Sequence, residues 1–211
     1  PDGGPTHDAP QNGYLNRSRV SLDYIPRDNN HPYRPAIIFR MAEAYLSYAE
    51  ALNESSERMS HKQEILDNLN KIRHRAGIAE YGTGTDENGF TRIKINFSDQ
   101  KEVRRLIHKE RRVEFVGEGV RYHDLRRWKT AHYGIGNLNE QGENPDWGVN
   151  GPDYGMNYYG TEYTDQGDNA FFKRTKYMDR VYPRKFYWYP IHQSEIDKDP
   201  TLVQGPFWLG E

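Results

Sequence analysis

Glu110 and Glu114 are the residues of this sequence whose type and spacing could do acid–base chemistry. They lie four positions apart, so on a helix their side chains project side by side. Two carboxylates that flank a sugar in an open cleft can serve as acid and base in the cleavage of a glycosidic bond. The spacing therefore raises the hypothesis of a carbohydrate-active enzyme that uses Glu110 and Glu114.

Arginines surround this pair along the sequence and favour a structural interpretation. A glutamate buried beside arginine stays charged and hydrogen-bonded, because burial of an isolated carboxylate would cost several kcal/mol. We therefore expect a structural ion network at the junction of two helices, with catalysis as the alternative. Its expected members, besides the two glutamates, are Arg111, Arg112, Arg121, Arg126 and Arg127.

The rest of the sequence offers little reactive chemistry. It has no cysteine, which excludes a disulfide, a thiolate nucleophile and a zinc–thiolate site. The histidines do not cluster, and no phosphate-binding loop, serine nucleophile elbow or dinucleotide fingerprint occurs. We expect no enzymatic activity, no cofactor and no bound metal.

Basic residues are frequent between positions 101 and 129, with ten lysines or arginines against five acids. The acids are interspersed, whereas phosphate binding favours a face of one sign. The formal net charge is -2, and no signature of the common DNA- or RNA-binding modules occurs. We therefore expect no nucleic-acid partner.

Apolar periodicity predicts a mainly α-helical fold. The first helix is expected over residues 37–53, and the second follows Ser60, which forms a capping-box signature with Gln63. Together they make a helical hairpin over residues 37–76, the unit of tetratricopeptide-like arrays.

A third helix is expected after Asp99, and the glycines that follow it separate it from a short fourth helix over residues 120–129. Between the hairpin and the third helix, residues 78–98 have turn residues and weak alternation, which indicate at most a small β-hairpin. The buried stripe of the third helix is expected to contain Val103, Leu106, Ile107 and Val113.

Residues 133–189 lack periodicity, yet half of the aromatic residues lie there. The chain is polar, with a mean hydropathy of -1.05, but its aromatic content of 13% is unlike that of disordered chains. A long segment of this kind is usually a functional loop or a disordered one, and the rings favour an ordered loop. Residues 187–196 then predict a short strand followed by a helical turn.

The first ten residues show no periodicity and no initiating methionine, so we expect that the chain begins within a longer protein. Residues 1–35 are interpreted as a loop-rich leading segment and residues 36–211 as the main domain. No apolar run approaches the roughly 20 residues that cross a bilayer, and no signal peptide is recognisable.

Five segments, taken in order, resemble the C-terminal half of SusD/RagB proteins. The resemblance spans most of residues 33–208 and rests on the order and spacing of the segments. The sequence departs from the family at His192, where proline is frequent, and at the closing turn around Gly205. The matching segments are residues 39–52, 70–77, 110–128, 187–196 and 199–204.

The resemblance implies a SusD-like α-superhelical fold, present here in part, and a non-enzymatic lipoprotein on the surface of the Gram-negative outer membrane. Such proteins cover a SusC-like TonB-dependent transporter and capture oligosaccharides or related nutrients for uptake. The resemblance places the lipid anchor and further tetratricopeptide-like helices outside this chain. A purely structural assembly protein remains an alternative.

The aromatic-rich irregular segment, residues 133–189, supplies candidates for ligand binding under this resemblance. A sugar ring stacks its C–H face on tyrosine or tryptophan, while its hydroxyls bond to polar side chains. The same rings could instead pin the loop to the helices or to the transporter. The stacking candidates are Trp147, Tyr154, Tyr158, Tyr159 and Tyr163, and their polar neighbours are Asn144, Asp146, Asn150 and Asn157.

Overall fold

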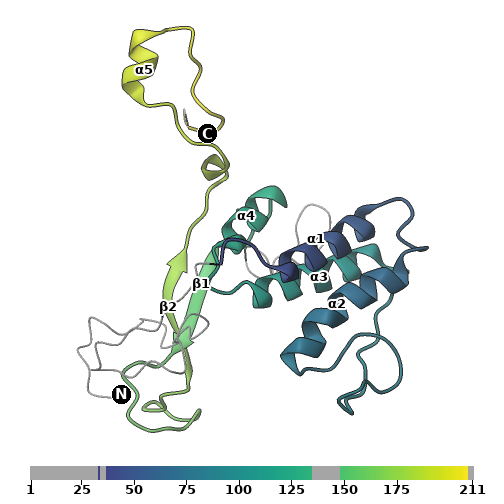
Figure 1. Ribbon diagram of the computed structural model, residues 1–211. Coiled ribbons are helices and arrows are strands. Elements are labelled where there is room, and N and C mark those ends of the chain that lie inside the picture. The colour runs from purple at the N-terminus through teal and green to yellow at the C-terminus, as the bar shows by residue number, and fades with distance from the viewer. Residues whose placement is uncertain (1–32, 34–36, 135–147, 209–211) are drawn as a thin grey trace. The chain divides into compact units, whose positions relative to one another are not determined.

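The computed structural model describes residues 33, 37–134 and 148–208. The chain divides into two compact units, Arg17–Arg121 and Tyr122–Glu211 with Pro1–Asn16. We name them the helical unit and the mixed unit and describe each by itself (Figure 1). The predicted division at residue 35 stays a prediction.

Three helices build the helical unit: α1 (Met41–Glu54), α2 (Lys62–Ala76) and α3 (Gln100–Glu114). Helix α1 packs against both α2 and α3, and Figure 1 shows the three lying alongside one another. Their facing sides bury an aliphatic core that contains Leu46, Ala49, Ile65, Leu69, Val103 and Ile107. The predicted helical hairpin and the mainly α-helical fold are confirmed.

The start of α1 was predicted too early. The helix begins at Met41, and Arg40 before it has extended backbone angles. Ile38 is 96% exposed, so it does not extend the buried stripe. Arg40 directs its guanidinium to Glu114 and Glu118, and these long-range contacts hold it outside the helix.

Helix α2 does not use the predicted capping box. Its N-cap residue is His61, without a side-chain cap, and the Ser60 hydroxyl donates to the Glu57 carbonyl instead. The end of α2 agrees with prediction, because Gly77 adopts a left-handed conformation with φ 67° and its N–H caps the last turn.

Helix α3 begins as predicted, with the Asp99 carboxylate accepting from the N–H groups of Lys101 and Glu102. Its buried stripe was wrong at one position, since Val113 is 64% exposed. The helical period carries the stripe from Ile107 to Glu110 and Arg111 instead, and both are buried.

Residues 78–98 form a loop rather than the predicted β-hairpin. In the described part of this segment the pairing is limited to isolated bridges, Tyr81 with Ile93 and Thr85 with Thr91. Asp86 replaces a strand ladder: its carboxylate accepts from the backbone N–H groups of Glu80, Asn88 and Phe90 at 2.8–3.1 Å. The buried Asp86 side chain therefore holds the loop together with backbone bonds such as that from the Gly82 N–H to the Ile93 carbonyl.

The mixed unit contains an antiparallel pair, β1 (Gly151–Met156) with β2 (Arg174–Arg180), inside the segment that was expected to be irregular. Strand β2 is exposed at nearly every position, so it has no buried face to produce alternation in the sequence. The small β element of this fold thus lies here, not at residues 78–98.

Shorter helices complete the described chain. Helix α4 (Val120–Arg127) begins after the glycines, and its residues from Tyr122 onward belong to the mixed unit. Residues 188–192, which follow the 3₁₀ helix η1 (Arg184–Tyr187), do not form the strand predicted at the start of residues 187–196, whereas α5 (Gln193–Lys198) confirms the predicted helical turn. Among the described residues, no helix is long and apolar enough to span a membrane.

Candidate functional site

The expected ligand-binding segment is only partly within the described residues. Asn144, Asp146 and Trp147 lie outside them. The remaining candidates lie in the mixed unit, on β1 or beside it. They differ in how much of each side chain is available to a ligand.

Two ring pairs lie in the loop between β1 and β2. Tyr158 and Tyr159 meet edge to face with centroids 5.6 Å apart, and Tyr159 is 88% exposed. The Tyr163 side chain is 68% exposed, and its ring centroid lies 6.3 Å from that of Phe172, which is also exposed. Phe172 was not predicted, because it stands apart in sequence from the tyrosines. These exposed rings have faces on which a sugar can stack.

Backbone bonds hold the ring pairs in one folded loop. The Asn157 N–H donates to the Phe171 carbonyl, and the Phe171 N–H donates to the Glu162 carbonyl. Gly160 allows this approach, since a Cβ there would lie 2.6 Å from the Phe171 nitrogen. The rings are therefore displayed by an ordered loop.

Tyr154, Asn150 and Asn157 are occupied by contacts within the protein. The Arg174 guanidinium carbon lies 4.0 Å from the Tyr154 ring centroid and covers one face. The Asn150 amide donates to the His132 and Tyr182 carbonyls and accepts from the Tyr182 N–H. Asn157 donates to the Asp168 carbonyl. Asn150 in particular ties three segments of the chain together.

The glutamate pair lies in the helical unit, against guanidinium groups. Glu110 is 6% exposed, and its carboxylate accepts from Arg73 at 2.5 Å and from the Tyr81 hydroxyl at 2.8 Å. Burial and the neighbouring charge of Glu110 raise the pKa of Tyr81. The phenol therefore stays protonated and donates to the carboxylate.

Glu114 accepts from two arginines of different segments, Arg40 and Arg75. Arg40 also forms a bidentate pair with Glu118, at 2.9 and 2.7 Å. Burial opposes the charge on Arg40, but the hydrogen bonds to the two glutamates outweigh it and raise the arginine's pKa. These contacts join α3 to the segment before α1 and to the end of α2.

The arginines observed at the pair were not those expected from sequence proximity. Among the predicted members, Arg111 donates to the Ser47 hydroxyl, and Arg112 and Arg121 lie on α3 and α4. In the mixed unit, Arg127 pairs with Asp124, and Arg126 donates to backbone carbonyls near the tail. Glu110 and Glu114 are instead met by Arg40, Arg73 and Arg75.

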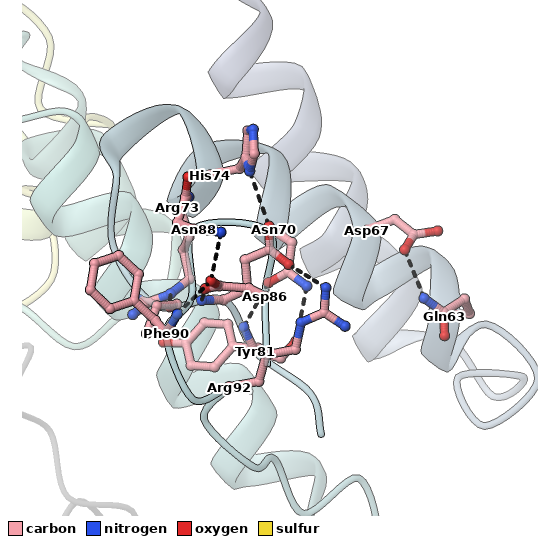
Figure 2. A network of polar contacts seen from close by, with 12 residues as sticks. Gln63, Asp67, Asn70, Arg73, His74, Tyr81, Asp86, Asn88, Phe90 and Arg92 are labelled. Atoms are coloured by element: carbon pink, nitrogen blue, oxygen red, sulfur yellow. Dashed lines mark hydrogen bonds and ion pairs between the residues drawn. The ribbon is translucent and has the colours of Figure 1, made fainter. Parts of the chain in front are cut away.

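A cavity of about 700 Å³ lies in the helical unit between α2 and the loop of residues 80–97. Asn70 of α2 fixes the loop, accepting from the Tyr81 N–H at 2.8 Å and donating to the Tyr81 carbonyl at 2.9 Å. Figure 2 shows this contact beside the Asp86 turn. Neither Glu110 nor Glu114 lines the cavity.

Charged side chains of both signs surround this cavity. Arg92 donates to Glu80 at 2.8 Å, and His74 lies 3.2 Å from the same carboxylate. The Gln63 amide donates to Asp67 at 2.7 Å along α2 (Figure 2). Among the described residues, no group of histidine, aspartate and glutamate side chains is arranged to hold a metal.

The chain belongs to the SusD family, whose family model matches residues 2–208. This confirms the resemblance noted in the sequence. SusD-like protein P25 from Formosa agariphila is 32% identical over 109 residues, which are 52% of this chain and 18% of that protein. SusD-like protein P38 from the same organism is 32% identical over 103 residues, which are 49% and 19%.

Comparison of the structure with solved structures also indicates the SusD family. The crystal structure of a SusD-like protein from Bacteroides fragilis matches with a TM-score of 0.54 and 27% identity, covering 82% of this chain and 26% of that one. The match to either curated relative covers less than a fifth of that relative's length. The family model and the fold comparison therefore agree on the SusD family.

Proposed function

We propose that this chain takes part in the non-catalytic capture of oligosaccharides or related nutrients for uptake. The observation that carries the proposal is the match of the SusD family over residues 2–208. By family resemblance, the partner is a SusC-like TonB-dependent transporter, and the location is the outer-membrane surface. The family resemblance also implies membrane association through a lipid anchor.

The surroundings of the glutamate pair support binding without catalysis. A glycosidase needs its two carboxylates to face a sugar across an open cleft. Here Glu110 faces Arg73 and Tyr81, and Glu114 faces Arg40 and Arg75. The carboxylate oxygens are thus engaged by donors of the protein itself, and neither glutamate lines the cavity of the helical unit.

The ring pairs support a carbohydrate as the captured nutrient. Tyr159, Tyr163 and Phe172 are exposed aromatic residues on one loop of a polar protein. Exposed rings of this kind are suited to the C–H faces of sugars, and tyrosine adds a hydroxyl at the rim.

Calorimetry and reducing-end analysis on the same samples test the proposal. We expect binding heat with at least one oligosaccharide of a panel from starch, xylan, mannan and laminarin, and no new reducing ends. Turnover that is abolished in Glu110→Gln would instead support the carbohydrate-active enzyme. Neither heat nor turnover would support a purely structural assembly protein.

A further inference from the structure

We propose that the cavity between α2 and the loop of residues 80–97 is a second binding site, for a neutral oligosaccharide. The inference rests on the proposed function of nutrient capture, and it places a ligand in the helical unit in addition to the ring pairs of the mixed unit. The volume of about 700 Å³ lies within the range of small-molecule sites, roughly 300–1,000 Å³.

The charges around the cavity favour a neutral ligand. Three acids and three bases line it, so a ligand of either net charge would meet as many like charges as opposite ones. Part of this charge is already compensated, since Glu80 is paired with Arg92 and contacted by His74. A neutral polyol avoids the repulsion while its hydroxyls donate to the acids and accept from the bases.

Several polar side chains that line the cavity have hydrogen-bonding groups without a partner in the described protein. The Arg92 Nε is buried and has no hydrogen-bond partner among the described residues. A buried donor of this kind is costly unless water or a ligand oxygen meets it. In the same described part of the chain, the side chains of Thr83, Glu87 and Lys94 make no hydrogen bond or ion pair, and all three line the cavity.

The cavity also has apolar surface and a rigid frame. Leu66, Ile95 and Phe97 line it and are half-buried against the helical core, which leaves part of each side chain open to a sugar's C–H face. The double hydrogen bond between Asn70 and Tyr81 fixes the loop to α2 (Figure 2). A preformed site of this kind loses little conformational freedom when a ligand binds.

Methyl NMR of the protein locates binding directly. We expect the neutral oligosaccharides of starch, xylan, mannan or laminarin to shift the methyl signals of Leu66 and Ile95 on titration. Oligogalacturonate and a tripeptide mixture serve as charged comparators and should shift them less. A stronger response to either comparator would overturn the neutral-ligand assignment.

Variants test the same site without removing the fold. Thr83→Trp fills the cavity from an exposed position and should abolish the methyl shifts. Arg92→Lys keeps a cation for Glu80 but removes the planar guanidinium that lines the cavity, and should weaken cavity binding about tenfold. The matched control is Arg104→Lys. Arg104 also forms an ion pair with a glutamate, Glu54, but neither residue lines the cavity.

The outcomes separate this inference from the proposed function. If sugar binding persists unchanged in Thr83→Trp and Arg92→Lys, with thermal unfolding as a fold check, the cavity site is wrong and nutrient capture stands. If Tyr159→Ala weakens overall binding while the methyl shifts persist, both sites are supported. If no sugar produces heat or shifts, the capture proposal and the cavity site fail together.

Discussion

Both units contain arginines that pair with carboxylates and arginines that donate to backbone carbonyls, but the best-connected arginines of each unit join different kinds of structure. In the helical unit, Arg73 meets the carboxylate of Glu110 and Arg40 meets that of Glu118. In the mixed unit, Arg126 donates to the backbone carbonyls of Phe186 and Tyr187 at 2.5 and 2.6 Å. One set joins packed helices and the other holds irregular chain.

The difference follows from what each unit leaves unsatisfied. Backbone groups of helices bond within the helix, so side chains between helices need partners of their own, and a guanidinium with a carboxylate is neutral as a pair. Irregular chain leaves carbonyls without regular partners, and a guanidinium offers several donors to them. Side-chain chemistry thus replaces regular secondary structure in the mixed unit.

Two spectroscopic probes can follow the units separately. All four tryptophans lie at positions 128, 147, 188 and 208, in the mixed unit, while residues 17–121 have none. Far-UV circular dichroism reports mainly on α1, α2 and α3 of the helical unit. Variants in one unit should therefore move one signal more than the other.

Removal of the Glu110 carboxylate should have the largest effect. Glu110→Ala leaves Arg73 buried without its counter-charge and the Tyr81 hydroxyl without its acceptor, and should lower the free energy of unfolding by about 3 kcal/mol. Urea unfolding followed by circular dichroism measures it. Lys109→Ala, at an exposed position of the same helix, should change stability by less than about 0.5 kcal/mol. An equal shift of the tryptophan signal would show that the units do not unfold separately.

Asn150 is the matching test in the mixed unit. Asn150→Ala removes the amide that bonds to the His132 carbonyl and to both backbone groups of Tyr182, and should cost about 2 kcal/mol. Here the tryptophan fluorescence transition should move and the circular dichroism transition should stay. Asn157→Ala is the control, because the side-chain bond that it removes, to the Asp168 carbonyl, lies at an exposed site. A loss as large as that of Asn150→Ala in the control would argue against this role.

Removal of the Glu114 carboxylate should lower the free energy of unfolding less than removal of the Glu110 carboxylate. Arg75 is partly exposed, and Arg40 retains Glu118 when Glu114 is lost, so Glu114→Ala should cost about 1 kcal/mol. Sugar affinity of the folded protein, measured by calorimetry below the unfolding temperature, should be unchanged. A large loss of affinity at full stability would contradict a purely structural role for the glutamate pair.

The helices were predictable because their signals are local. Apolar periodicity located α1 and α2, and Asp99 marked the start of α3. Starts that depend on distant contacts were not predictable: Arg40 stays outside α1 through its bonds to Glu114 and Glu118. Strand β2 left no pattern, since it buries no face.

The ion pairs and the cavity were beyond sequence reasoning for the same reason. Glu110 and Arg73 are 37 positions apart, so nearness in sequence selected other arginines. The cavity depends on the hydrogen bonds between the Asn70 side chain and the backbone of Tyr81, and no pattern in the sequence predicts these bonds. The exposed tyrosines could be proposed from composition alone, whereas their partner Phe172 needed the fold.

The exposed ring of Tyr159 should contribute least to the free energy of unfolding. Its variant therefore tests a residue expected to act in binding, whereas the variants above test residues expected to act in stability. Tyr159→Ala removes a side chain that is 88% exposed, so the free energy of unfolding should change by less than about 0.5 kcal/mol. Loss of one stacking face should weaken binding of the neutral oligosaccharide about fivefold. Calorimetry measures the affinity, and Tyr189→Ala, at another exposed ring of the mixed unit, is the control. Unchanged affinity in Tyr159→Ala, or an equal loss in the control, would assign the ring pairs to loop structure or to contact with the proposed transporter partner.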